Sequence, residues 1–110
     1  MTDRLYERML CMKNVVLSAD GDRMVYSVPD SVADRLDEYC LAFTEWLYAS
    51  PHARKYRIGG GLCYNEADFI SYLNRWIFPE QPSQLVRNLG WIDFGQPLPE
   101  PWQDCPQFNF

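Results

Sequence analysis

Residues 30–49 constrain the fold more than any other segment, because a helical pattern runs through them between two prolines. Pro29 precedes the segment and Ser50-Pro51 follows it. Proline suits the first turn of a helix, and the residue before a proline disfavours helix, so both ends are marked. Asp30 or Ser27 is expected to cap the first turn. The predicted helix would bury a stripe of apolar residues at steps of three or four, namely Val32, Leu36, Cys40, Phe43 and Leu47.

Two apolar runs upstream of this helix predict a β-hairpin. Val15-Val16-Leu17 and Met24-Val25-Tyr26 flank Ala19-Asp20-Gly21-Asp22, and β-branched runs on either side of Asp-Gly are typical of paired antiparallel strands. Residues 2–12 are expected to form a short helix before the hairpin. Downstream, the glycines at 59–61 predict a bend beside a short strand, where backbones pass closely.

Two further helices are predicted after the glycines. Asn65 and Asp68 resemble a capping box that starts a helix over residues 65–78. Ser83 is expected to cap a short helix that runs through Leu89 and ends at the following glycine. The helix over residues 65–78 would bury Phe69, Ile70, Leu73, Trp76 and Ile77.

Residues 91–110 combine proline with aromatic side chains. Proline suppresses both helix and central strand, whereas a solvated tail would not usually carry this many aromatic rings. We expect the segment to lie extended across the helices and to complete the core. The residues concerned are Pro97, Pro99, Pro101 and Pro106, with Trp91, Phe94, Trp102, Phe108 and Phe110.

Length and composition complete the fold class. A chain of 110 residues with 47% apolar and 15% aromatic residues has enough surface to bury to fold as one domain, residues 1–110. We predict an α+β domain in which helices dominate, with a short β-hairpin or small antiparallel sheet and an extended C-terminal arm. No run approaches the ~20 apolar residues of a membrane-spanning helix, and charges interrupt the N-terminal region where a secretion signal needs an apolar run. We therefore expect a cytoplasmic protein with no membrane partner.

The cysteine and histidine content argues against a metal centre or an enzyme. Cys11, Cys40, Cys63 and Cys105 lie far apart in the sequence, so we expect reduced thiols that are mostly buried. None of them, alone or with His52, has the spacing of zinc ligands. The glycines at 59–61 lack the lysine and hydroxyl of a phosphate-binding P-loop. We expect no catalytic residue, no cofactor and no metal.

Charge is distributed unevenly along a chain whose net charge is −5. Residues 20–45 hold seven acids against two arginines, whereas residues 51–58 hold three bases and no acid. On the predicted helix the acids share the face opposite the buried stripe over ~22 Å, and only Arg35 would neutralise part of it. The candidate partner-binding residues are Asp30, Asp34, Asp37, Glu38 and Glu45, with Asp20 and Asp22 of the hairpin turn extending the acidic field.

This acidic face has a functional and a purely structural interpretation. Like charges one turn apart cost a few tenths of a kcal/mol each, so a face selected only for stability would mix signs. The functional interpretation is therefore that the face binds a basic protein, and the structural alternative is a solvated helix face. Direct binding of nucleic acid is disfavoured, because an acidic surface repels phosphates.

Three runs also carry a resemblance to a class of proteins: PDSVADRL at 29–36, LCYNEADF at 62–69 and CPQFNF at 105–110. From Val28 to its end the chain resembles small enterobacterial proteins encoded beside polymorphic toxins, the immunity proteins of contact-dependent growth inhibition and Rhs-type systems. The resemblance implies a cytoplasmic protein that binds one toxin domain and blocks its active site or its substrate contacts. Many such toxins are nucleases with basic clefts, which an acidic face would match. Tyr48, Tyr56 and Trp102 are the expected aromatic anchors of such an interface.

Three alternatives stay open. The first is an acidic phage-type inhibitor that mimics nucleic acid, for which a net charge of −5 is small. The second is a small enzyme or ligand-binding protein that uses His52, Cys63 and the glycine loop, and it predicts a deep pocket. The third is a structural subunit, which predicts a large apolar surface patch.

Overall fold

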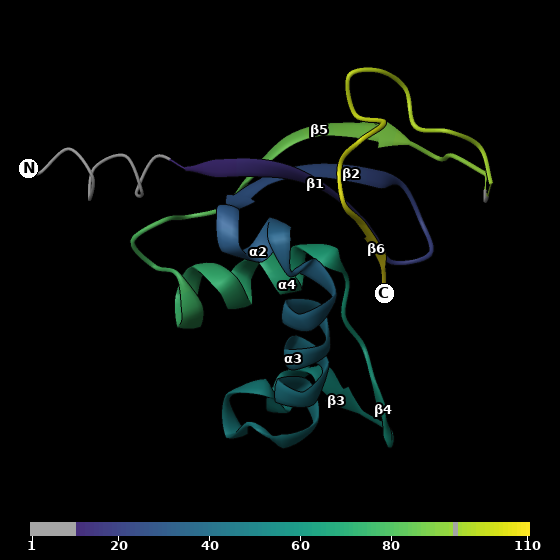
Figure 1. Cartoon of the computed structure of the whole chain (residues 1–110). Coiled ribbons are helices and arrows are strands. Elements are labelled where there is room, and N and C mark those ends of the chain that lie inside the picture. The colour runs from purple at the N-terminus through teal and green to yellow at the C-terminus, as the bar shows by residue number, and fades with distance from the viewer. Residues whose placement is uncertain (1–10, 94) are drawn as a thin grey trace, which may run out of the picture.

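The computed structural model describes residues 11–93 and 95–110. A four-stranded sheet lies between helices on one face and the C-terminal segment on the other (Figure 1). The domain therefore combines helices with a sheet, as the α+β prediction requires. The helix predicted over residues 2–12 lies outside the described residues apart from its last two positions, and at Met12 the chain is already in a strand.

The predicted hairpin is confirmed and is longer than its two apolar runs. β1 (Met12–Ser18) pairs antiparallel with β2 (Arg23–Pro29). The side chains of β1 alternate between the two faces of the sheet. Val15 and Leu17 join the core beneath the helices, whereas Val16 belongs to a second cluster on the opposite face. An uninterrupted apolar run is the pattern of a strand buried on both faces.

Two more strands widen the hairpin into a mixed sheet of order β5-β2-β1-β6. β5 (Gln84–Gly90) pairs antiparallel with β2, and β6 (Gln107–Asn109) pairs parallel with β1. The sheet is thus wider than the predicted hairpin, and it is not wholly antiparallel. Such a short parallel strand carries no local pattern, because its partner lies far away in the sequence.

The short helix predicted from Ser83 through Leu89 is wrong, because these residues lead into and form β5. Asn74 holds the start of the strand. The Ser83 N–H donates to Asn74 Oδ1 at 2.6 Å, and Asn74 Nδ2 donates to the Ser83 carbonyl oxygen at 3.0 Å. The following residues then pair along the edge of β2, so tertiary pairing overrides a weak local helix preference.

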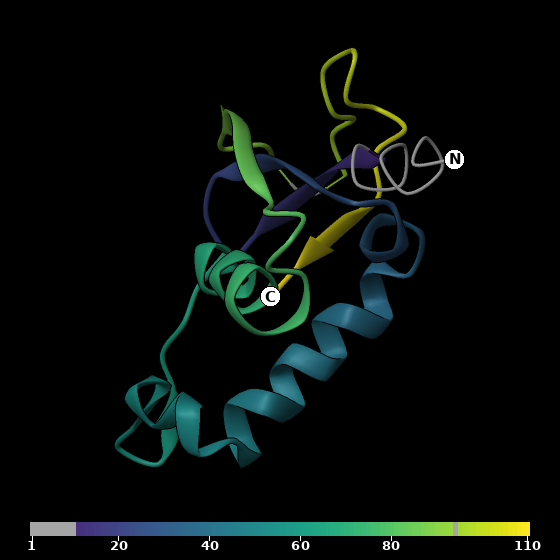
Figure 2. The same cartoon turned by 90° about the vertical axis from the view of Figure 1, so that its left-hand side faces the viewer.

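The single long helix predicted over residues 30–49 is divided in two. α2 (Asp30–Asp34) and α3 (Leu36–Ala49) are separated by Arg35, whose φ and ψ of −132° and 43° are not helical. The predicted side-chain cap by Asp30 or Ser27 is absent. α2 contacts the adjoining ends of β1 and β2, whereas α3 runs away from the sheet past α4 (Figure 2). The two helices therefore pack against different partners, which one straight rod would not allow.

A 3₁₀ helix and a tight hairpin follow α3. They are η1 (Pro51–Tyr56) and the strands β3 (Arg57–Ile58) and β4 (Gly61–Leu62). Gly59 and Gly60 form the turn with φ of 58° and 82°. Nothing lies within 4 Å of a Cβ placed on either glycine. The predicted bend is confirmed, but the glycines permit positive φ rather than a close passage of backbones.

The second predicted helix begins at its capping box and ends in an irregular turn. The Asp68 N–H donates to Asn65 Oδ1 at 3.2 Å, and the Asn65 N–H donates to Asp68 Oδ2 at 2.9 Å. α4 (Glu66–Tyr72) then passes into the π-helical turn η2 (Leu73–Ile77). The Phe78 N–H closes this turn on the Leu73 carbonyl oxygen at 2.7 Å. A π turn inserts extra backbone into the helix and shifts the face of the residues that follow.

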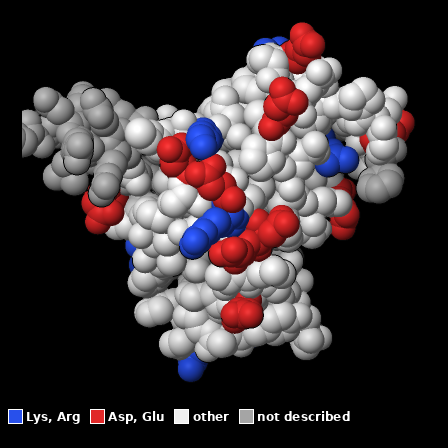
Figure 3. Space-filling view, in the orientation of Figure 1, with Lys and Arg blue, Asp and Glu red and all other residues white. Residues whose placement is uncertain are grey.

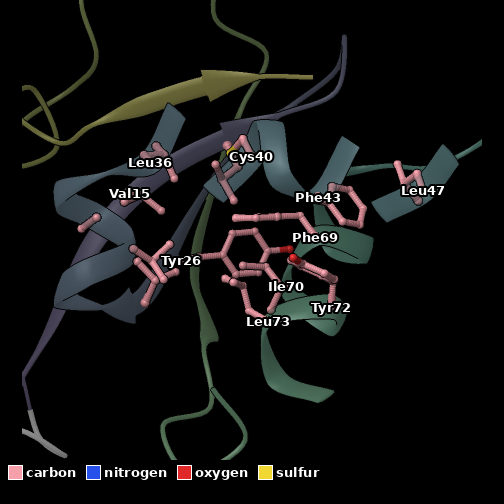
Figure 4. Close-up of a cluster of buried hydrophobic side chains, with 14 of the residues drawn as sticks. Val15, Tyr26, Leu36, Cys40, Phe43, Leu47, Phe69, Ile70, Tyr72 and Leu73 are labelled. Atoms are coloured by element: carbon pink, nitrogen blue, oxygen red, sulfur yellow. The ribbon is translucent and has the colours of Figure 1, made fainter. Parts of the chain in front are cut away.

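The main core lies between the helices and the sheet (Figure 4), and Phe43 is fully buried within it. Among the described residues, five aromatic rings have centroids 5.1 to 6.0 Å from that of Phe43. Among the positions predicted to be buried after the capping box, Trp76 and Ile77 are 40% and 37% exposed, because the π turn rotates them outward. Tyr72, which was not predicted to be buried, is part of the core instead. The rings around Phe43 are those of Trp46, Tyr64, Phe69, Tyr72 and Phe110.

The C-terminal segment covers the sheet rather than the helices. Leu98 is buried against Val16 and Val25 on the sheet face opposite the helices. Among the described residues of this segment, only Phe108 and Phe110, in and after β6, pack against the main core. The prediction that the whole segment crosses the helices is therefore wrong. The reason is that the hairpin has two apolar faces, and the helices cover only one of them.

Candidate functional site

The predicted acidic stripe is split by the break at Arg35. Asp30 and Asp34 belong to α2, whereas Asp37 and Glu38 lie in the first turn of α3. The single stripe of ~22 Å along one helix axis does not form, because the two helices differ in direction. Acidic side chains do gather over α2 and α3, with basic side chains among them (Figure 3).

Lys13 neutralises the α2 part of the stripe. Its Nζ donates to Asp34 Oδ1 at 2.8 Å and lies 3.8 Å from Asp30 Oδ1. The hydrogen bond to Asp34 raises the pKa of Lys13, with further contributions from the charges of Asp30 and Asp34. The prediction that only Arg35 compensates the acids is therefore wrong. Lys13 is remote in sequence, and the pairing of β1 with β2 brings it beside the start of α2.

The hairpin acids do not extend this field. The turn between β1 and β2 lies at the opposite end of the strands from α2, and strands of this length span about 20 Å. Asp20 has a positive φ of 56°, and its N–H donates to Asn109 Oδ1 at 3.1 Å. Asp22 accepts a hydrogen bond from Asn88 Nδ2 at 3.2 Å. Both residues attach the turn to the neighbouring strands, so the structure separates them from the other acidic candidates.

A coherent surface remains on the outer side of α3, which we call the α3 outer face. Leu41 is 58% exposed and Tyr48 is 67% exposed, at positions between and beyond the acids. On a helix these positions fall within an arc of about 100°, on the side away from the buried residues. The α3 outer face consists of Asp37, Glu38, Leu41, Glu45 and Tyr48.

The three aromatic residues expected to anchor an interface differ in their exposure. Tyr48 is exposed, but Tyr56 is buried in the main core and Trp102 packs in the second cluster. Leu41 was not predicted as a contact residue. Its position out of phase with Cys40 and the rest of the buried stripe is the sequence signal that would have revealed it.

The helix dipole accounts for some of these acids and not for others. Asp37 and Glu38 lie at the N-terminal end of α3, where negative charge is favourable. Arg57 binds the other end, where one guanidinium nitrogen lies 2.9 to 3.2 Å from the carbonyl oxygens of Leu47, Tyr48 and Ser50. Glu45 lies near this C-terminal end, where a negative charge opposes the dipole. Its charge has no stabilising partner among the ion pairs of the described residues.

The second candidate site, His52 with Cys63, is not assembled as a pair. His52 lines a cavity between η1, α3 and α4, and Cys63 is not among the residues that line it. The Cys63 N–H donates to the Tyr56 carbonyl oxygen at 2.8 Å, which fixes the strand that follows the glycines.

The thiols are less buried than expected. Cys40 is buried and Cys105 is half-buried, whereas Cys11 and Cys63 are exposed. Burial raises the pKa of the Cys40 and Cys105 thiols, and nearby Asp37 and Asp104 raise them further. Within residues 11–93 and 95–110, no group of His, Cys, Asp and Glu side chains has an arrangement that would hold a metal ion.

Comparisons with known proteins add no relative. No protein-family model matches this chain, and no curated protein or solved structure matches it. Over the described part of the chain, no helix combines the length and apolar character that crossing a membrane requires.

Proposed function

We propose that this chain is a protein-binding inhibitor of the immunity type, which neutralises a cognate toxin domain in the cytoplasm. The α3 outer face would cover the active site or the substrate contacts of that domain. The observation that carries the proposal is the exposure of Leu41 and Tyr48 among Asp37, Glu38 and Glu45.

Large exposed side chains among like charges are what an interface requires. A few apolar or aromatic anchors supply most of the affinity of an interface. Complementary charge raises the rate of encounter and excludes wrong partners. Tyr48 and Leu41 would be the anchors, and the three acids would steer a basic partner toward them. A toxin domain with a basic cleft, such as a nuclease, fits this chemistry best.

The nucleic-acid mimic is supported less well. A mimic needs carboxylates that are distributed like phosphates over much of the surface. Here Lys13 pairs with Asp30 and Asp34, and the hairpin acids lie at the other end of the sheet. The structural-subunit alternative requires a large apolar surface patch, and the exposed apolar side chains Leu85, Val86 and Trp91 lie outside the α3 outer face.

The proposal is tested first by capture from native lysate at low and at high salt, with the captured protein identified and purified. We expect a basic partner that is toxic when expressed alone and harmless when co-expressed with this chain. Its affinity is then measured for the double variant Asp37→Lys/Glu45→Lys. We expect binding about tenfold weaker or more, with most of the loss in the association rate.

Two further variants separate anchors from steering. Tyr48→Ala is expected to weaken binding by about tenfold or more through faster dissociation. The charge-matched control Glu80→Lys/Asp104→Lys changes exposed acids outside α3 and should leave affinity within about twofold at physiological salt, because distant surface charges are screened. Equal affinity of the α3 double variant and the control would contradict the proposed surface.

A further inference from the structure

The last turn of α3, η1 and the helix that runs from α4 into η2 line a cavity of about 340 Å³ that is open to solvent on one side. This volume lies in the lower part of the range of small-molecule sites. Four aromatic side chains, one from each of α3, η1, α4 and η2, form its walls, namely Trp46, Tyr56, Tyr72 and Trp76. None of the residues of the α3 outer face lines this cavity, and the proposed inhibitor function does not use it.

The aromatic walls are held by contacts with each other. The ring centroid of Trp46 lies 5.0 Å from that of Tyr72, 6.2 Å from that of Tyr56 and 6.5 Å from that of Trp76. His52 stacks on Trp76, with 4.5 Å between ring centroids and an interplanar angle of 29°. Pairs at these distances are favourable beyond the area that they bury. The walls are therefore positioned before any ligand arrives.

The polar groups of the cavity are hydrogen-bond donors without an acid among them. Lys55 and Arg75 line it together with His52 and the Ser71 hydroxyl, and no Asp or Glu of the described residues does. Lys55 Nζ lies 5.0 Å from the ring centroid of Tyr56, and the guanidinium of Arg75 lies 5.1 Å from that of Trp76. Within the described residues neither cation forms an ion pair. Positive charge without a carboxylate is the chemistry of an oxyanion site.

The π turn is what brings Arg75 and Trp76 to the cavity. The helical spacing after the capping box predicts that Trp76 faces the core, yet it is 40% exposed and lines the cavity. Turns of this kind occur frequently at functional sites, where an irregular backbone re-aims side chains. The arrangement of this wall therefore depends on a local departure from regular helix.

We propose that this cavity binds a nucleotide, with its phosphate on Lys55 and Arg75 and its planar base against the aromatic walls. The cavity has room for more than an inorganic anion, and rings of this kind stack on bases. The free nucleotide is favoured over the end of a nucleic-acid strand, because the chain carries a net charge of −5 that would repel further phosphates. The proposal does not depend on the inhibitor function.

The test titrates the full chain with the nucleoside monophosphates, adenosine and inorganic phosphate, and follows tryptophan fluorescence and the heat of binding. At least one monophosphate is expected to bind with a Kd below about 1 mM. Adenosine and phosphate should each bind about tenfold more weakly or worse, because each lacks one half of the recognition. Absence of binding by all monophosphates, or binding of phosphate as tight as that of the nucleotide, overturns the proposal.

Matched variants locate the site. Lys55→Gln/Arg75→Gln should weaken nucleotide binding by about tenfold or more, since both charge-assisted contacts are lost. Arg35→Gln/Arg87→Gln removes the same charge from exposed positions that lie outside η1, α4 and η2 and do not line the cavity, and it should leave binding within about twofold. An equal loss in the two double variants would mean diffuse attraction and would overturn the assignment. Circular dichroism verifies that each variant is folded.

Two further measurements are needed. One distinguishes a free nucleotide from the end of a nucleic-acid strand, and the other distinguishes the cavity proposal from the inhibitor proposal. A short single strand with a 5′-phosphate should bind no more tightly than the free monophosphate, whereas binding about tenfold tighter would assign the site to a strand end. Asp37→Lys/Glu45→Lys should keep nucleotide binding within about twofold at physiological salt. Loss of partner binding alone then concerns the α3 outer face, and loss of nucleotide binding alone concerns the cavity.

Discussion

The α3 outer face and the cavity at the end of the same helix are built in opposite ways. The outer face comes from one helix, and its members follow from the helical repeat alone. The cavity joins α3, η1, α4 and η2, and its cations come from two separate elements. The first is acidic with apolar anchors, and the second is basic with aromatic walls. A charged face can therefore be read from a local repeat, whereas a pocket depends on how segments converge.

Both regions depend on the core beneath α3. Phe43 faces inward on the helix whose other side carries Leu41 and Tyr48. Its ring also contacts Trp46 and Tyr72, two walls of the cavity.

Phe43→Ala should have the largest effect, because it removes the support of both regions. The ring is fully buried among five others, and truncation of a buried Phe lowers the free energy of unfolding by about 3–5 kcal/mol. Urea denaturation followed by circular dichroism measures the change. Leu41→Ala is the control on the same helix, and it should stay within about 0.5 kcal/mol of the parent because Leu41 is exposed. A small effect of Phe43→Ala would show that the core is centred elsewhere.

Arg57→Ala should have an intermediate effect that falls mainly on the cavity. The guanidinium binds the last carbonyl groups of α3 and the Ser50 carbonyl oxygen at the start of η1. Its loss is expected to lower the free energy of unfolding by about 1–2 kcal/mol and to weaken nucleotide binding more than partner binding. Denaturation and the two binding assays measure this difference. Arg54→Ala, on the exposed side of η1, is the control, and an equal loss there would contradict the role of Arg57.

The smallest expected changes in stability are those at two acids of the outer face, Asp37 and Glu45. Asp37→Lys should destabilise the fold by about 0.5 kcal/mol, because it places a positive charge in the first turn of α3. Glu45→Lys should instead be neutral or stabilise it by a few tenths of a kcal/mol, since a positive charge suits the C-terminal end. Thermal and urea denaturation of the single variants reveal the two signs. The same sign for both variants would mean that the dipole does not account for Asp37.

Sequence patterns predicted the elements that need only near neighbours. The hairpin around Asp20-Gly21 and the capping box of Asn65 and Asp68 are confirmed. The buried stripe that contains Phe43 is also confirmed. Each depends on residues within a few positions of one another, so a local repeat carries the information.

Two of the errors involve partners that are distant along the chain. The segment after Ser83 became a strand because the edge of β2 was available to it. The acids of α2 form ion pairs with Lys13 because the hairpin register places it beside them. Of the candidate site, sequence analysis found the acids of the outer face and Tyr48, and it missed Leu41. It named His52 for a possible pocket, but it missed the cations Lys55 and Arg75 that line the cavity.

The sequence by itself thus determined which short segments are helical or extended and which face of α3 is acidic. Only the tertiary structure decided how far that acidity is neutralised, that the helix is interrupted at Arg35, and which side chains meet around the cavity. The physical reason is the range of the interactions. Helical spacing, caps and turns are set by backbone geometry within one or two turns, whereas ion pairs, sheet edges and pockets exist only after remote segments have packed together.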